Sequence, residues 1–203
     1  MNAGKTVFDS VLFRLPRLRR LASQLVPDKR VTISLLHRQL TVSSRLEIGL
    51  LRLAWLVNSS PTGNELATLL SLAGLVRPGC TFLDVGANVG LYSVPLASIG
   101  EVIGFRCVAV EPNPATAERL RHNLAPYRCA TVVEAAASNR AAKLDMVYSS
   151  LTSVTFRVAE SSSDPRFPRL NQQTYSIPAV RLDELEELAG RARDRCPWVA
   201  RQR

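Results

Sequence analysis

The sequence has little of what metal sites, disulfide frameworks and membrane spans require. Its 203 residues include only two histidines, His37 and His122, and its four cysteines show no C-x-x-C spacing. These features argue against a metal centre. Cys80, Cys107 and Cys129 fall at or inside apolar segments, so we expect free core thiols in a reducing cytosol. No apolar run approaches the ~18 residues of a membrane span, and no signal-type core follows the N-terminus.

Lysine is also scarce, with three of the 26 basic residues, and the formal net charge of +9 is unevenly spread. Residues 1–45 carry +7 and residues 191–203 carry +4, which leaves −2 for the middle. A nearly neutral body lacks the continuous basic face of a nucleic-acid-binding fold. An amphipathic pattern over residues 7–25 carries four arginines, and it fits either a weak peripheral membrane or partner contact or a helix covering the core. We expect a cytoplasmic protein without a nucleic-acid partner.

The most informative segment is Thr81–Gly90, which reads T-F-L-D-V-G-A-N-V-G. An apolar run that ends in Asp84 and opens into Gly86 and Gly90 predicts a buried parallel strand, a tight turn and a helix start. A second such strand, Cys107–Glu111, again ends in a carboxylate. Because open α/β sheets bind ligands at the carboxyl ends of their strands, two acids there predict a nucleoside site.

The chemistry of these acids favours S-adenosylmethionine over a nicotinamide dinucleotide. A pyrophosphate requires G-x-G-x-x-G and no anion nearby, whereas this turn has G-x-x-x-G and Asp84 two residues before the first glycine. Asp84 suits the cationic methionine end of S-adenosylmethionine, and Glu111 can accept hydrogen bonds from both ribose hydroxyls. Free N–H groups at a helix start at Gly90 would suit the ligand carboxylate. A turn that binds nothing is the remaining alternative.

Two further residues are predicted at the same site. Asn88 lies in the turn, where its side chain either contacts the cofactor or only braces the turn. Glu134 follows a predicted third strand, whose end lies near the adenine in this architecture. The predicted cofactor-binding set is therefore Asp84, Gly86, Asn88, Gly90, Glu111 and Glu134.

At this point the chain resembles a known family. L-D-V-G-A-N-V-G-L-Y-S, V-A-V-E-P-N-P, R-L-R-H-N-L and V-R-L-D-E-L are similar to motifs of the FkbM-type methyltransferases, over roughly Pro61 to Leu188. The resemblance implies an S-adenosylmethionine-dependent O-methyltransferase acting on a hydroxyl of a sugar or secondary metabolite. It also implies a class I methyltransferase fold, which is a Rossmann-like, doubly wound α/β sheet.

The hydrophobic pattern agrees with such a fold. Strands alternate with helices, which indicates right-handed βαβ units and a parallel sheet. An N-terminal hairpin and helices precede the sheet, and short antiparallel strands follow it. The expected strands are 31–36, 40–43, 80–85, 106–111, 130–135, 143–148, 154–158 and 176–181, and the expected helices are 45–57, 64–76, 90–99 and 114–124.

Several polar residues have structural interpretations. Thr62 and Glu65 form a capping box that would open the helix 64–76. Asn113 is placed to cap the helix that begins with Pro114. Asn123 would bond the last carbonyls of that helix. Asp183 would act as the N-cap of a helix ending at Gly190.

The end of the chain departs from the family. After L-D-E-L the family continues with an apolar strand beside the central one, but residues 191–203 hold no run of four aliphatics, and Pro197 would interrupt a central strand. We expect a C-terminally truncated or frameshifted product in which the strand 81–85 presents an unpaired edge. The predicted regions are 1–60, an N-terminal basic extension, 61–190, a partial methyltransferase domain, and 191–203, a basic tail.

The acceptor half of the site, including any general base, is not recognisable, so no catalytic residue is assigned. A non-catalytic nucleoside-binding or scaffold module is the second hypothesis, and a dinucleotide-dependent oxidoreductase is the third.

Overall fold

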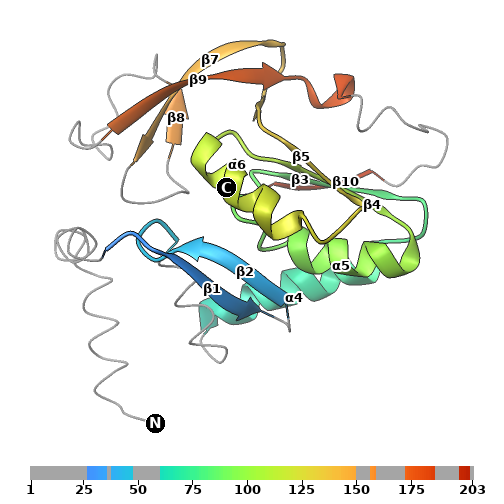
Figure 1. Cartoon of the computed structure of the whole chain (residues 1–203). Coiled ribbons are helices and arrows are strands. Elements are labelled where there is room, and N and C mark those ends of the chain that lie inside the picture. The colour runs from blue at the N-terminus through green and yellow to red at the C-terminus, as the bar shows by residue number, and fades with distance from the viewer. Residues whose placement is uncertain are drawn as a thin grey trace.

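The computed structural model describes residues 27–35, 38–47, 60–149, 156–158, 172–185 and 197–201. Its centre is a four-stranded parallel sheet in the order β10-β3-β4-β5 (Figure 1). The strands are β3 (Thr81–Val85), β4 (Arg106–Val110), β5 (Ala130–Val133) and β10 (Pro197–Arg201). Helix α5 (Ser93–Ile103) connects β3 to β4, and α6 (Pro114–Leu124) connects β4 to β5. The predicted α/β class with a Rossmann-like parallel sheet is confirmed. When the four strands are numbered by their order in the chain, they lie in the order 3-2-1-4 across the sheet, which is the order of such sheets.

The prediction that β3 lacks a neighbour on one side is wrong. β10 pairs with β3 in parallel, with Pro197 opposite Thr81 and Arg201 opposite Val85. Pro197 stands at the first position of its strand, where proline is tolerated, and not in the strand interior. Since β10 follows β5 in the chain but pairs with β3, the switch point of the sheet lies between β3 and β10.

The two faces of this sheet are covered differently. On one face, Phe82, Cys107 and Ala109 share a core with α4 (Ser60–Leu75), α5 and α6. On the other face, Leu83 and the valines of β4 pack against Leu185, just after the short 3₁₀ helix η1 (Leu182–Glu184). Asp84 is on the same face as Phe82, because side chains alternate along a strand. The carboxylate therefore faces the helices.

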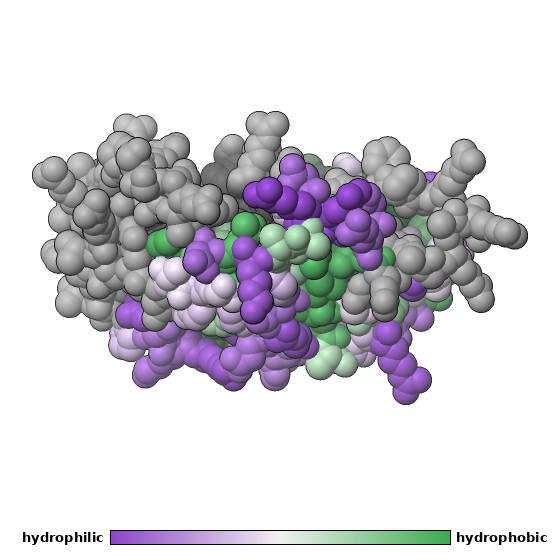
Figure 2. All heavy atoms as spheres, turned by 90° about the horizontal axis from the view of Figure 1, so that it is seen from above, coloured by the Kyte–Doolittle hydropathy of each residue, from purple (hydrophilic) through white to green (hydrophobic). Residues whose placement is uncertain are grey.

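A second sheet lies above the first in Figure 1, in the order β6-β9-β7-β8. Its strands are β6 (Ala136–Ala137), β7 (Ala142–Ser149), β8 (Phe156–Val158) and β9 (Gln172–Val180). β7 pairs antiparallel with β8 and β9, as the predicted short strands require. Figure 2 looks down on this side, where a strip of apolar residues is bordered by hydrophilic ones.

The predicted N-terminal hairpin is confirmed. β1 (Arg30–Leu35) and β2 (Arg38–Ser43) pair antiparallel, and Ile33, Leu40 and Val42 join the core beneath the parallel sheet. The boundary at residue 60 between extension and methyltransferase domain stays a prediction. Predictions for 7–25, for 186–196 and for most of the helix 45–57 fall outside the described residues.

Two predicted helix starts are wrong. Helix α4 begins at Ser60, so Thr62 and Glu65 lie within it and not at its start. Glu65 instead accepts a hydrogen bond from the Tyr92 hydroxyl. Helix α5 begins at Ser93, because Gly90 has a φ of 97°, in the left-handed region, and cannot belong to the helix.

Three local interpretations can also be checked. Asn113 caps α6 as predicted, accepting hydrogen bonds from the N–H groups of Ala115 and Thr116. Asn123 does not bond the carbonyls that end α6, since its side chain contacts β2 and the glycine turn. Asp183 is not an N-cap, because it lies inside η1 and its carboxylate pairs with Arg181. Within the described residues, no helix is long and apolar enough to cross a bilayer.

Candidate functional site

The site is built where β3 and β4 end. In the register of the sheet, Asp84 lies opposite Ala109, and Glu111 comes two residues after Ala109. Side chains two apart on a strand share a face, so both carboxylates lie on the side of α5 and α6. The intervening turn 86–92 leads from β3 into α5. We call Asp84, Asn88 and Glu111 the acidic corner.

The Asp84 carboxylate is fully buried, and one of its two oxygens is hydrogen-bonded. Its Oδ2 accepts a hydrogen bond of 2.5 Å from the hydroxyl of Ser93, the first residue of α5. Its Oδ1 is buried and has no hydrogen-bond partner among the residues that the structure describes. Burial raises the pKa of Asp84 to about 6, against the lowering effect of the Ser93 hydrogen bonds. A buried acceptor without a donor is costly, which makes it a candidate for ligand binding.

Glu111 is 3% exposed and fixed by backbone donors. Its Oε2 accepts from the N–H of Asn88 at 2.9 Å, and its Oε1 accepts from the N–H of Asn113 at 2.9 Å. Burial raises the pKa of Glu111 to about 7, although both backbone hydrogen bonds act in the opposite direction. Each carboxylate oxygen has two lone pairs, so each can accept one further hydrogen bond.

The turn owes its shape to three residues with positive φ. Gly86 has a φ of 82°, Asn88 one of 51° and Gly90 one of 97°. A Cβ at Gly90 would lie 2.9 Å from Cγ2 of Val94 and 3.1 Å from Cδ1 of Leu120, whereas a Cβ at Gly86 would meet nothing within 4 Å. Gly90 is therefore required for packing, and Gly86 faces open space. The Asn88 side chain is buried, and its Oδ1 has no hydrogen-bond partner.

The backbone donors of this turn are mostly used by the protein. The N–H groups of Gly86 and Ala87 both donate to the carbonyl of Val110, and that of Gly90 donates to the carbonyl of Ala87. The N–H of Asn88 is held by Glu111. The N–H of Gly90 itself is therefore not free, and the carboxylates of the corner offer a ligand buried acceptor oxygens. A pyrophosphate would meet anions here instead of the donors that it needs.

Glu134 stands apart from the other predicted residues. It follows β5, but its carboxylate pairs with Arg121 of α6 at 2.5 Å, and its side chain is one-third exposed. Within the described residues, no hydrogen bond joins it to Asp84, Asn88 or Glu111. The structure thus brings together Asp84, Asn88 and Glu111, with Gly86 and Gly90 shaping the turn.

Three more residues hold this site: Ser93 and Arg119 were not predicted from the sequence, and Asn123 was expected only at the end of its helix. Ser93 anchors Asp84 to α5. The Asn123 side chain donates to the carbonyls of Val89 and Thr41, and its oxygen accepts from the N–H of Thr41. Arg119 forms a buried ion pair with Glu47, in the turn after β2. A polar residue on the apolar face of α6 was the available signal, since Arg119 and Asn123 are four apart and share a face.

Comparisons with known proteins give weak likenesses. No protein-family model and no curated protein matches the chain. Among solved structures, M. jannaschii TYW2 in complex with AdoMet aligns at a TM-score of 0.40 and 13% identity, covering 54% of this chain and 44% of that one. Trm5b from Pyrococcus abyssi aligns at a TM-score of 0.38 and 17% identity, covering 54% of this chain and 29% of that one. Precorrin-6y C5,15-methyltransferase from Geobacter metallireducens GS-15 aligns at a TM-score of 0.31 and 27% identity, covering 39% of this chain and 40% of that one.

This chain therefore spans less than half the length of each of these structures. The fold assignment rests on the strand order and register. The class of site rests on the acidic corner.

Proposed function

We propose that the chain carries the cofactor half of an S-adenosylmethionine-dependent methyltransferase. The supporting observation is the acidic corner itself, which presents buried carboxylates beside the switch point of a Rossmann-like sheet, while four backbone N–H groups of its turn already donate within the protein. Such a site favours a ligand that brings hydrogen-bond donors and positive charge. S-adenosylmethionine has an ammonium, a sulfonium and two ribose hydroxyls, and a dinucleotide has a dianionic linker instead.

The two carboxylates of the corner would each bind a different part of the cofactor. Glu111 would accept from the ribose hydroxyls, using the lone pairs that Asn88 and Asn113 leave free. Asp84 would accept from the ammonium through Oδ1, held in place by Ser93. Because Asp84 is fully buried, its contact with a ligand requires the turn above it to move. Gly86 leaves room for close approach of the ligand to the backbone.

The cofactor supplies an electrophilic methyl group on sulfur. In the proposed reaction the acceptor oxygen forms a bond to that carbon, the carbon–sulfur bond breaks, S-adenosylhomocysteine leaves, and the acceptor hydroxyl loses its proton. The protein's main contribution would be to hold oxygen and sulfonium in line. No described residue is assigned as the base.

The hydroxyl of a sugar or secondary metabolite is proposed as acceptor, on the FkbM-type motifs alone. Turnover of a panel of sugar and polyketide alcohols, measured with radiolabelled methyl donor, tests this choice. Methylation of an added RNA or DNA, and of no alcohol, would contradict the acceptor class. Cofactor binding without any turnover would favour the non-catalytic binding module.

Titration calorimetry with S-adenosylhomocysteine tests the cofactor assignment. We expect binding that Glu111→Ala weakens by about 1–3 kcal/mol, the typical cost of lost hydrogen bonds to a charged group. Glu134→Gln is the matched comparison, because the Glu134 carboxylate pairs with Arg121. Equal binding by the Glu111 variant would remove Glu111 from the site. Enhanced NADH fluorescence on mixing, without S-adenosylhomocysteine binding, would favour the oxidoreductase.

A further inference from the structure

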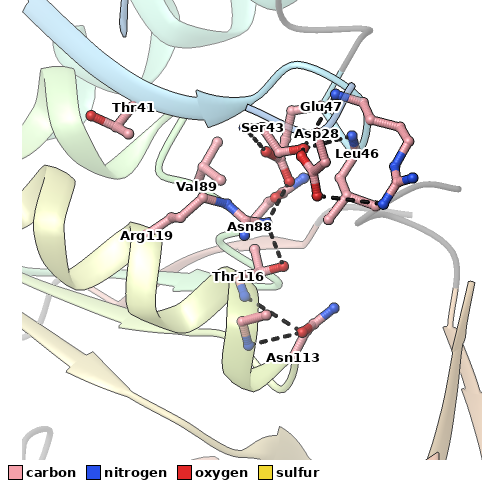
Figure 3. Close-up of polar contacts among 12 residues, drawn as sticks. Asp28, Thr41, Ser43, Leu46, Glu47, Asn88, Val89, Asn113, Thr116 and Arg119 are labelled. Carbon is pink, nitrogen blue, oxygen red and sulfur yellow. Dashed lines mark hydrogen bonds and ion pairs between the residues drawn. The ribbon is translucent and has the colours of Figure 1, made fainter. Parts of the chain in front are cut away.

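A buried ion pair joins the N-terminal hairpin to helix α6. Nη2 of Arg119 lies 2.7 Å from Oε1 of Glu47, whose side chain is fully buried, while that of Arg119 is 10% exposed. Oε2 of Glu47 also accepts from the N–H of Ser43 at 2.5 Å, and Arg119 also donates to Oγ1 of Thr116 at 3.3 Å. Figure 3 shows Arg119 reaching from α6 towards Glu47. We call Ser43, Glu47, Thr116 and Arg119 the hairpin cluster.

The same helix holds the acidic corner. Its N-cap residue, Asn113, donates its backbone N–H to Glu111. Near its other end, Asn123 bonds both Thr41 of β2 and the carbonyl of Val89 in the glycine turn. Helix α6 therefore contacts the hairpin and the acidic corner at once, and Arg119 is the buried cation between Asn113 and Asn123.

We propose that the Glu47–Arg119 pair acts on the cofactor site through Glu111, with Arg119 favouring the ionised carboxylate and Glu47 limiting how much of that positive charge Glu111 experiences. Both are positioning residues in this account, since neither touches the ligand. The N-terminal hairpin would then influence the cofactor site in addition to covering the core.

The charges around Glu111 define the expected signs. Arg119 on α6 lowers its pKa, and Asp84 on β3 raises it. The carboxylate of Glu111 also contributes to the raised pKa of the buried Tyr148 phenol on β7. Removing the charge of Arg119 should therefore raise the titration midpoint of Glu111. Removing the charge of Glu47 should lower it, because the positive charge of Arg119 then acts on Glu111 without being offset.

Opposite shifts from the two halves of one ion pair separate this proposal from a purely structural role. Glu111 can be titrated by the chemical shift of its ¹³C-labelled side-chain carboxyl, identified by its loss in Glu111→Gln. Arg119→Gln should move the midpoint up by about 0.5–1 pH unit, and Glu47→Gln should move it down by a similar amount. Glu118→Gln on the same helix is the control, because Glu118 pairs with Arg30 at the surface.

Midpoints that stay within about 0.2 pH units of wild type, the size of shift expected from a distant, screened charge, would overturn the proposal. Midpoints that shift in the same direction in both single variants would overturn it as well. If either single variant fails to fold, the double variant Glu47→Gln/Arg119→Gln replaces it. That variant leaves no unpaired buried charge at the pair, and its midpoint should also rise. An unchanged midpoint there would equally contradict the proposal.

The consequence for ligand binding rests on the proposed function. Arg119→Gln should weaken S-adenosylhomocysteine binding about 3- to 10-fold at pH 6.5 and leave it near wild type at pH 8.5, since the ionised carboxylate is restored there. If wild-type protein binds no S-adenosylhomocysteine at either pH, the proposed function fails. The carboxyl titration still decides the role of the ion pair.

Discussion

The acidic corner and the hairpin cluster both bury charged side chains on the helix side of the parallel sheet, but the hairpin cluster pairs its acid with a basic side chain and the acidic corner does not. In the hairpin cluster, Glu47 is matched by Arg119. In the acidic corner, no hydrogen bond or ion pair within the described part of the chain joins a cation to Asp84 or Glu111, and Oδ1 of Asp84 has no hydrogen-bond partner there. The paired charges fasten two segments together. The unpaired charges cost stability, which is typical of a ligand site.

Breaking the paired cluster should have the largest effect on stability. Glu47→Ala leaves Arg119 buried without a counter-ion, and removal of one partner from a buried pair costs about 3–5 kcal/mol. Urea denaturation measures the change in unfolding free energy. Glu118→Ala breaks the exposed Arg30–Glu118 pair on the same helix and should change little. Equal losses in the two variants would contradict the contrast between buried and surface pairs.

Substitutions of the two glycines beside the acidic corner should also differ in how much stability they cost. Gly90→Ala places a Cβ 2.9 Å from Val94 in a backbone of φ 97°, so we expect a loss of about 3 kcal/mol. Gly86→Ala meets only the backbone strain of φ 82°, which costs about 1 kcal/mol. Thermal unfolding of both variants provides the comparison. A larger loss at Gly86 would mean that the turn packs differently.

Neutralising the unpaired acid should increase stability instead. The folded-state pKa values of Asp84 and Glu111, about 6 and 7, exceed their ordinary values of 3.8 and 4.5. Their contribution to stability is therefore complete below pH 4 and is lost as pH rises to about 7. Asp84→Asn should stabilise the protein by about 1–3 kcal/mol at pH 8 and flatten this pH dependence. Wild-type stability that rises between pH 4 and 7 would contradict the account of the corner.

The smallest expected effect concerns the cap of α6. Asn113→Ala removes the side-chain acceptor for Ala115 and Thr116 but keeps the backbone N–H that holds Glu111. The cost should be about 1 kcal/mol in unfolding free energy. S-adenosylhomocysteine affinity should be unchanged, which calorimetry can verify.

Local signals explain which predictions succeeded. Strand β4 and helix α6 were predicted to within a residue or two, because apolar runs and the Asn113–Pro114 cap are encoded by neighbouring residues. The pairing of β10 was not foreseen, because a strand that begins with proline and has few aliphatics gives no apolar pattern. Its place beside β3 depends on contacts with residues more than a hundred positions away.

The same distinction between local signals and long-range contacts applies to the residues of the site. Asp84 and Glu111 were predicted as neighbours, because both end apolar strands and parallel strands end at one edge. The Glu47–Arg119 pair joins residues 72 positions apart, and no local pattern reports such a contact. Glu134 was assigned to the site from its position after a strand, and its pairing with Arg121 could be learned only from the fold.

We infer that the buried acids of the corner bind a cationic nucleoside, and the release of protons on binding provides the test. Wild-type protein is titrated with S-adenosylmethionine at pH 6.5 in two buffers that differ in ionisation enthalpy. Because the pKa values of Asp84 and Glu111 are near 6 and 7, a cation that stabilises both carboxylates should release protons to the buffer. We predict binding with net proton release, reduced in Glu111→Gln. Absence of binding, or binding with no proton release, would contradict the account.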